Sequence, residues 1–122
     1  MTITQAISRA DAMTPNTYSA LDKIRWLVTL DGRIKKEVID RHEGGELISA
    51  TEYSEDIDML LLVPAPWDEL YVHWICAMIH YANGEIKRYN NALALFDESY
   101  TAYARHYTAE HMPRSHGSRF RF

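Results

Sequence analysis

The sequence predicts a mainly α-helical protein: a small bundle of three main helices preceded by a short N-terminal helix. Apolar residues recur at helical spacing over most of the chain, and only Asn83-Gly84-Glu85 separates the last two helical patterns. The chain has 122 residues, of which 47% are hydrophobic and 25% charged, as in an ordinary soluble globular domain. We expect one helical domain over residues 1–111 and an extended C-terminal arm over residues 112–122.

The first two helices are predicted from amphipathic patterns and from the signals at their ends. Residues 4–13 are weakly amphipathic, and Pro15-Asn16 ends this short helix. Ser19, with Asp22 three residues later, resembles a capping box and starts a second helix that runs to about His42.

One glycine-containing stretch lies within this expected second helix, and another follows its end. Asp31-Gly32 interrupts its apolar face and indicates a bend. Glu43-Gly44-Gly45 is expected to close the helix, because glycine accepts the left-handed conformation of a C-terminal cap.

A long acidic connection follows, without helical periodicity. Between residues 43 and 66 the chain has no lysine or arginine and six acidic side chains: Glu43, Glu46, Glu52, Glu55, Asp56 and Asp58. Residues 46–50 and 59–63 predict a short β-hairpin, or else 59–63 is an apolar run that lies across the bundle. Connections this long are unusual in small domains and commonly serve function or form interfaces.

The last two helices carry the clearest periodic signals. Pro64-Ala65-Pro66 predicts an extended approach, and residues 70–82 are apolar almost all round, as expected of a helix packed on several sides. The final helix is expected from Glu85 to His111 because its apolar residues are spaced alternately three and four apart: Ile86, Tyr89, Leu93, Phe96, Tyr100, Tyr103 and Tyr107. This stripe is a packing seam, either for the domain's own core or for a neighbouring subunit.

The sequence contains no catalytic, cofactor-binding or metal-binding motif, so we expect a protein that is not an enzyme. His73 and His80 are seven residues apart, which is not the spacing of two metal ligands on one helix. Cys76 lies inside an apolar pattern and is expected to be a small buried residue. The glycines form no phosphate-binding loop.

The charge distribution suggests a protein partner. The last eleven residues contain Arg114, Arg119 and Arg121 but no acid, so subtracting these three charges from the total of −4 leaves −7 on the rest. Three arginines alone would bind nucleic acid weakly, and the body of the chain is acidic, so we expect no sequence-specific DNA binding. The apolar runs are too short to span a bilayer. An acidic middle and a basic end favour electrostatic pairing within or between subunits.

Four stretches of the chain resemble a family of head–tail connector proteins, also called adaptor or head-completion proteins, of tailed bacteriophages. They are the run Leu62-Val63-Pro64-Ala65-Pro66-Trp67-Asp68-Glu69-Leu70-Tyr71, the helix junction with Asn83, Glu85, Arg88, Tyr89, Asn90 and Asn91, the exit with Tyr107 and Met112-Pro113, and the earlier segment from Lys23 to Glu46. The resemblance covers most of the chain.

The resemblance implies a virion protein made in the host cytoplasm. Its partners would be identical subunits in a ring, a dodecamer in such families, together with the portal protein and the next connector or tail component. The ring would extend the DNA channel, and DNA would only pass through it. No cofactor or membrane is implied.

From the charges and the resemblance together we predict the subunit interface. In the arm, the predicted contacts are Arg114, Arg119, Phe120, Arg121 and Phe122, because arginine and aromatic residues dominate interface energies. Their acidic complement is Glu52, Glu55, Asp56 and Asp58. Docking of the arm on its own bundle is the alternative for these residues. The alternative for the whole protein is a small cytoplasmic binding or regulatory module that recognises a partner helix through the tyrosine-rich seam.

Overall fold

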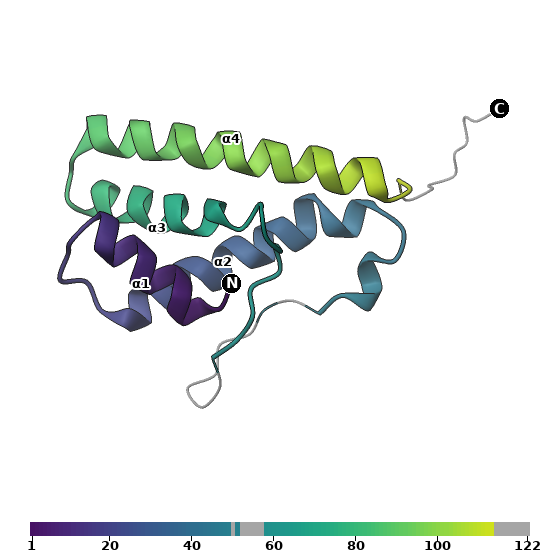
Figure 1. Ribbon diagram of the computed structural model, residues 1–122, viewed down its shortest axis with the longest axis horizontal. Coiled ribbons are helices and arrows are strands. Elements are labelled where there is room, and N and C mark those ends of the chain that lie inside the picture. The colour runs from purple at the N-terminus through teal and green to yellow at the C-terminus, as the bar shows by residue number, and fades with distance from the viewer. Residues whose placement is uncertain (50, 52–57, 114–122) are drawn as a thin grey trace.

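The computed structural model describes residues 1–49, 51 and 58–113. These residues form four α-helices, α1 (Ile3–Met13), α2 (Ala20–Glu37), α3 (Glu69–Ala82) and α4 (Ile86–Glu110), and two 3₁₀ turns, η1 (Ile39–Arg41) and η2 (Gly45–Leu47). Figure 1 shows α3 and α4 side by side as an antiparallel hairpin, with α1 and α2 packed on the opposite side of α3. The predicted mainly helical fold, three main helices and a short first one, is confirmed.

The helix α3 is the centre of the core, as its apolar sequence predicts. Seven of its residues are buried, and they contact the other three helices: Leu70, Tyr71, Val72, Ile75, Cys76, Ala77 and Ile79. The seam of α4 packs on α3, so it belongs to the domain's own core. Burial grows along the seam, from Ile86 at 58% exposed to Phe96 at 1% and Tyr103 at 2%.

The helix boundaries follow their capping residues. Ser19 accepts a hydrogen bond from the Asp22 amide at 3.2 Å and starts α2 as predicted. A complete capping box lies instead at Thr2 and Gln5, which start α1.

The expected end of the second helix at His42 is wrong by about one turn. The α-helix ends at Glu37, and the chain tightens into η1 before the glycine pair. Gly44 has the left-handed conformation with φ of 82°, but it precedes η2 and does not cap α2. A Cβ on Gly45 would lie 2.5 Å from the Ile39 carbonyl oxygen, so only glycine fits this corner. The helix continues through Asp31-Gly32 without interruption.

Residues 58–63, which we call the strap, lie across the bundle without regular secondary structure apart from a single bridge at Leu60 (Figure 1). Leu61 and Val63 are buried, whereas Leu60 is 70% exposed. Leu60 pairs with Thr2 in an isolated antiparallel bridge. The strap thus matches the predicted alternative in which residues 59–63 lie across the bundle. The first strand of the predicted hairpin, residues 46–50, overlaps η2.

Candidate interaction site

Most of the predicted interface lies outside the described residues. These predicted contacts are Arg114, Arg119, Phe120, Arg121, Phe122, Glu52, Glu55 and Asp56. Asp58 is described, and its carboxylate accepts a hydrogen bond from the Thr4 amide at 3.0 Å. This bond lowers the pKa of Asp58, because it favours the charged form. Asp58 therefore joins the strap to the first turn of α1 within one subunit.

The start of the C-terminal arm is fixed against the corner that follows α2. The Glu43 amide donates to the Met112 carbonyl at 2.8 Å, and His42 and Pro113 form an antiparallel bridge. His111 stacks on the Tyr107 ring with centroids 3.8 Å apart. These contacts hold the described start of the arm, Met112-Pro113, against the corner that follows α2.

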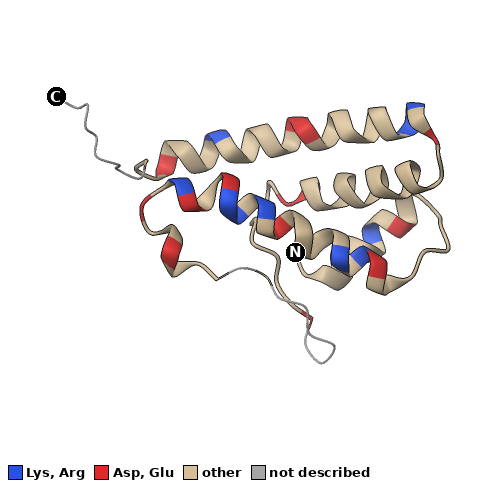
Figure 2. Ribbon diagram, turned by 180° about the vertical axis from the view of Figure 1, so that it is seen from behind, with Lys and Arg blue, Asp and Glu red and all other residues tan. Residues whose placement is uncertain are grey.

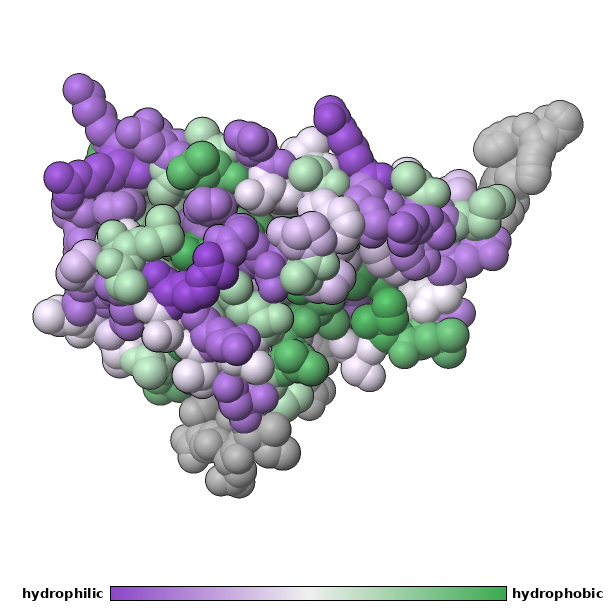
Figure 3. All heavy atoms as spheres, viewed as in Figure 1, coloured by the Kyte–Doolittle hydropathy of each residue, from purple (hydrophilic) through white to green (hydrophobic). Residues whose placement is uncertain are grey.

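Exposed apolar side chains mark this same end of the molecule. Leu47 is 83% exposed in η2, and Met112 is 67% exposed where the arm begins. Figure 3 shows hydrophobic residues gathered over this corner, below the C-terminal end of α4. Single exposed apolar residues are ordinary, but a group of them at one end of the bundle marks a surface suited to a protein contact.

A second group of exposed apolar residues lies at the opposite end of the bundle. Tyr81 and Ile86, on either side of the α3–α4 turn, are 62% and 58% exposed. Met13, at the end of α1, is 59% exposed. It lines a surface pocket together with His80, Asn83, Glu85 and Arg88, which belong to or flank the α3–α4 turn. Figure 1 places these chain segments together at the end remote from the arm.

Basic residues are interspersed with acids along α2 and its neighbours (Figure 2). Arg33 pairs with Glu37 at 3.0 Å, and Lys35 pairs with Asp40 at 2.5 Å. Of the three cations near the end of α2, Arg33, Lys35 and Lys36, two are thus paired with carboxylates. This arrangement is unlike the continuous basic stripe of a nucleic-acid-binding surface.

The most unusual polar group in the described part of the chain is Asp31, which is fully buried within α2. Its carboxylate accepts hydrogen bonds from the Tyr71 hydroxyl at 2.5 Å, from the Thr51 hydroxyl at 2.5 Å and from the Leu62 amide at 3.0 Å. The Tyr71 hydroxyl in turn accepts from the Val63 amide at 2.8 Å. One side chain of α2 thus joins α3 to both sides of the acidic connection.

Burial dominates the electrostatics of this cluster. It raises the pKa of Asp31, and the three donors offset only part of the effect. Burial together with the neighbouring carboxylate also raises the pKa of Tyr71, and burial, with Tyr107 and Asp31 nearby, raises that of Tyr103 to about 12. Sequence reasoning missed this cluster because Asp31-Gly32 was interpreted as a bend. The signal that was present is a single acid on an otherwise apolar helix face.

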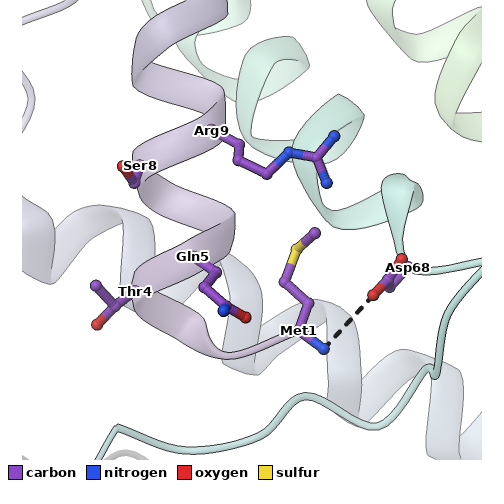
Figure 4. A pocket seen from close by; sticks show the side chains of 6 residues that line it. All are labelled: Met1, Thr4, Gln5, Ser8, Arg9 and Asp68. Atoms are coloured by element: carbon purple, nitrogen blue, oxygen red, sulfur yellow. Dashed lines mark ion pairs between the residues drawn. The ribbon is translucent and has the colours of Figure 1, made fainter.

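A pocket of about 490 Å³ lies on the outer side of α1, near the start of α3. Figure 4 shows the residues that line it: Met1, Thr4, Gln5, Ser8, Arg9 and Asp68. The Met1 amino group pairs with Asp68 at 3.5 Å, and Arg9 pairs with Glu69 at 2.5 Å. The charged groups around the pocket thus neutralise one another, and Ser8 has no histidine among the lining residues to activate it.

Two other residues considered for chemistry, His80 and Cys76, have structural partners. His80 contacts Glu85 at 2.9 Å across the α3–α4 turn. Cys76 is buried as predicted, its Sγ lies 3.9 Å from the Ala10 carbonyl oxygen, and burial raises the pKa of its thiol. Among the described residues no three histidine, cysteine or acidic side chains are arranged to hold a metal ion.

No family model, curated protein or solved structure matches this chain. No helix of the described residues has the length and apolar composition needed to cross a membrane.

Proposed function

We propose that this chain is a structural virion protein, the subunit of a head–tail connector ring beneath the portal. The ring extends the DNA channel and joins the capsid to the tail. The resemblance of four stretches to connector proteins suggests the function, and the arrangement of the exposed apolar residues is the observation that carries it.

Five of the exposed apolar residues form two different surfaces at opposite ends of one bundle, whereas Leu60 in the strap and Leu95 midway along α4 lie outside both. A contact between unlike surfaces is heterologous, and repeated heterologous contacts close into a ring when the rotation allows. The surface of Leu47 and Met112 at the arm and that of Tyr81, Ile86 and Met13 at the helical turn provide two such unlike surfaces. Tyrosine and methionine are enriched in protein interfaces.

The residues of the resemblance also have roles in building the subunit. Gly84 adopts a left-handed conformation with φ of 75° between Asn83 and Glu85, and the Asn83 side chain accepts from the Tyr18 hydroxyl at 2.6 Å. Met112-Pro113 pairs with the corner at His42-Glu43. A pattern that maintains a packed subunit and fixes the start of its arm suits a protein whose activity is assembly.

The alternative is a module that binds a partner helix through the tyrosine-rich seam. Such a groove would have to be open. Phe96, Tyr103 and Tyr107 are instead 1%, 2% and 6% exposed, because the seam packs on α3. The seam is therefore occupied by the chain's own core over its C-terminal half.

Deletion of residues 114–122 tests the proposal. We expect the full chain to form rings, seen by light scattering and electron microscopy in the presence of the portal, and the shortened chain to lose them while keeping its helical circular dichroism. A matched pair tests the apolar surface: Leu47→Ser should weaken assembly, whereas Leu95→Ser, midway along α4, should leave it unchanged. Unchanged assembly after the deletion would contradict the role of the arm, and a full chain that stays monomeric with the portal would contradict the function.

A further inference from the structure

The strap is an irregular segment whose hydrogen bonds are made with other parts of the chain. The Leu61 amide donates to the Met1 carbonyl at 3.0 Å, the Leu62 amide to Asp31 and the Val63 amide to the Tyr71 hydroxyl. Buried backbone amides need such partners, and without them the segment is costly to keep on the core. The Leu62 and Val63 amides of the strap thus depend on Asp31 and Tyr71 for their hydrogen bonds.

We propose that the strap opens and closes as a unit against the helical bundle, and that the Asp31 carboxyl group holds it closed through its hydrogen bonds to Leu62 and Tyr71. This proposal rests on the hydrogen bonds among α2, α3 and the strap, and does not depend on the connector function. It goes beyond that function because it assigns a conformational step to the subunit. The open strap exposes Leu61 and Val63, which are 6% and 0% exposed when it is closed.

The surroundings of Asp31 limit how strongly its ionised form can favour the closed state. The described residues include no ion pair to this carboxylate, and all its described partners are neutral donors. Among the described residues, the titratable groups that face it are Tyr71 from α3 and Tyr103 from α4, neither of which supplies a positive charge. A buried carboxylate without a cation regains hydration when the strap opens, and this gain opposes closure.

The helices do not depend on the strap in the same way. The α3–α4 hairpin packs through its own apolar seam, and the α2 backbone is hydrogen-bonded internally. Segments held by a few polar contacts beside a well-packed core commonly open with a smaller free energy than global unfolding.

Closure should weaken as the pH rises. Because the pKa of Asp31 is raised in the closed state, its stabilising effect is complete below the ordinary pKa of an aspartate and is lost as the pH rises through the raised value. The open strap, with a hydrated carboxylate, binds the proton less tightly. Deprotonation therefore shifts the population towards the open state.

Hydrogen exchange measured by NMR on the full chain tests the proposal. The protection of the Leu62 and Val63 amides is divided at each pH by that of the Ile75 and Ile79 amides in α3, which removes the intrinsic effect of pH on exchange. We expect this ratio to fall as the pH rises in the wild type. In Asp31→Asn, which keeps an oxygen acceptor but does not ionise, the ratio should not change with pH. Glu37→Gln, an exposed site on the same helix, is the control and should behave as the wild type does.

A second pair of variants separates the strap from general destabilisation. Tyr71→Phe keeps the ring but removes the acceptor of the Val63 amide, so exchange at Val63 should accelerate about tenfold relative to Ile75, the factor expected for one lost hydrogen bond. Tyr100→Phe, which removes an exposed tyrosine–carboxylate bond, should leave that ratio unchanged. Equal opening of strap and α3 amides at every pH would overturn the proposal. So would a pH dependence that survives in Asp31→Asn.

Discussion

Two tyrosine–carboxylate pairs join α2 to the α3–α4 hairpin, and they differ in almost everything except their chemistry. Tyr71 donates to Asp31 at 2.5 Å and Tyr100 donates to Glu37 at 2.6 Å. Asp31 is fully buried, with only neutral donors among its described partners, whereas the Glu37 side chain is 44% exposed and paired with Arg33.

The surroundings give the two carboxyl groups opposite pKa shifts. Burial raises the pKa of Asp31 despite its three donors. The hydrogen bonds from Tyr100 and Arg33 lower the pKa of Glu37, because water still reaches that side chain and burial counts for little. The same pair of groups is thus a surface contact at one place and a structural junction at the other.

Replacing Asp31 with alanine should have the largest effect on stability. The change leaves the Leu62 amide and the hydroxyls of Tyr71 and Thr51 buried without their acceptor. At about 1–3 kcal/mol for each buried donor left unpaired, we expect a loss on the order of 4 kcal/mol in the free energy of unfolding. Urea denaturation followed by circular dichroism measures it. Glu37→Ala should lower the free energy of unfolding by less than about 1 kcal/mol. Equal losses for the two variants would contradict the greater structural role of Asp31.

Removing one hydroxyl from each pair should give a smaller but still unequal effect. Tyr71→Phe leaves the Val63 amide without its acceptor and Asp31 with one donor fewer, for a loss of about 1–3 kcal/mol. Tyr100→Phe removes a solvent-accessible bond and should cost about 0.5 kcal/mol or less. Thermal unfolding of the two variants side by side provides the comparison, and a larger shift for Tyr100→Phe would contradict it.

The smallest expected effect is the pH dependence, and here the two sites differ in sign. Asp31 has a raised folded pKa, so its contribution to stability is present below the unfolded value near 3.8 and is lost as the pH rises through the folded value. Glu37 has a lowered folded pKa, so its contribution is present above the unfolded value near 4.5 and is lost as the pH falls through the folded value. Stability measured from acid to neutral pH should lose the first component in Asp31→Asn and the second in Glu37→Gln. A profile that neither substitution changes would contradict both assignments.

The sequence predicted the helices well because their signals are local. The three-and-four spacing of the last helix, the apolar run of residues 70–82 and the Asn83-Gly84-Glu85 turn each depend on neighbouring residues. Ser19 and Asp22 placed the start of α2 for the same reason.

Asp31 could not be assigned from the sequence, because its partners come from three other places in the chain. Tyr71 and Leu62 lie 40 and 31 residues away, and nothing local distinguishes their roles. An aspartate next to a glycine has a low helix propensity, which favours a break, but hydrogen bonds from distant segments outweigh that preference. Of the predicted interface, only Asp58 is described, and its observed contact is to Thr4. The function remains a prediction of the resemblance and of the two exposed ends.

The single thiol of the chain has a practical consequence. The Cys76 Sγ lies 3.9 Å from the Ala10 carbonyl oxygen of α1, and burial raises the pKa of its thiol, so we expect its modification to require local opening of the α1 contact. The rate at which a reagent modifies this thiol therefore measures how often α1 separates from α3, and no cysteine has to be introduced. Combined with exchange at the strap, it gives two independent measurements of local opening in the wild-type chain, one for α1 and one for the strap.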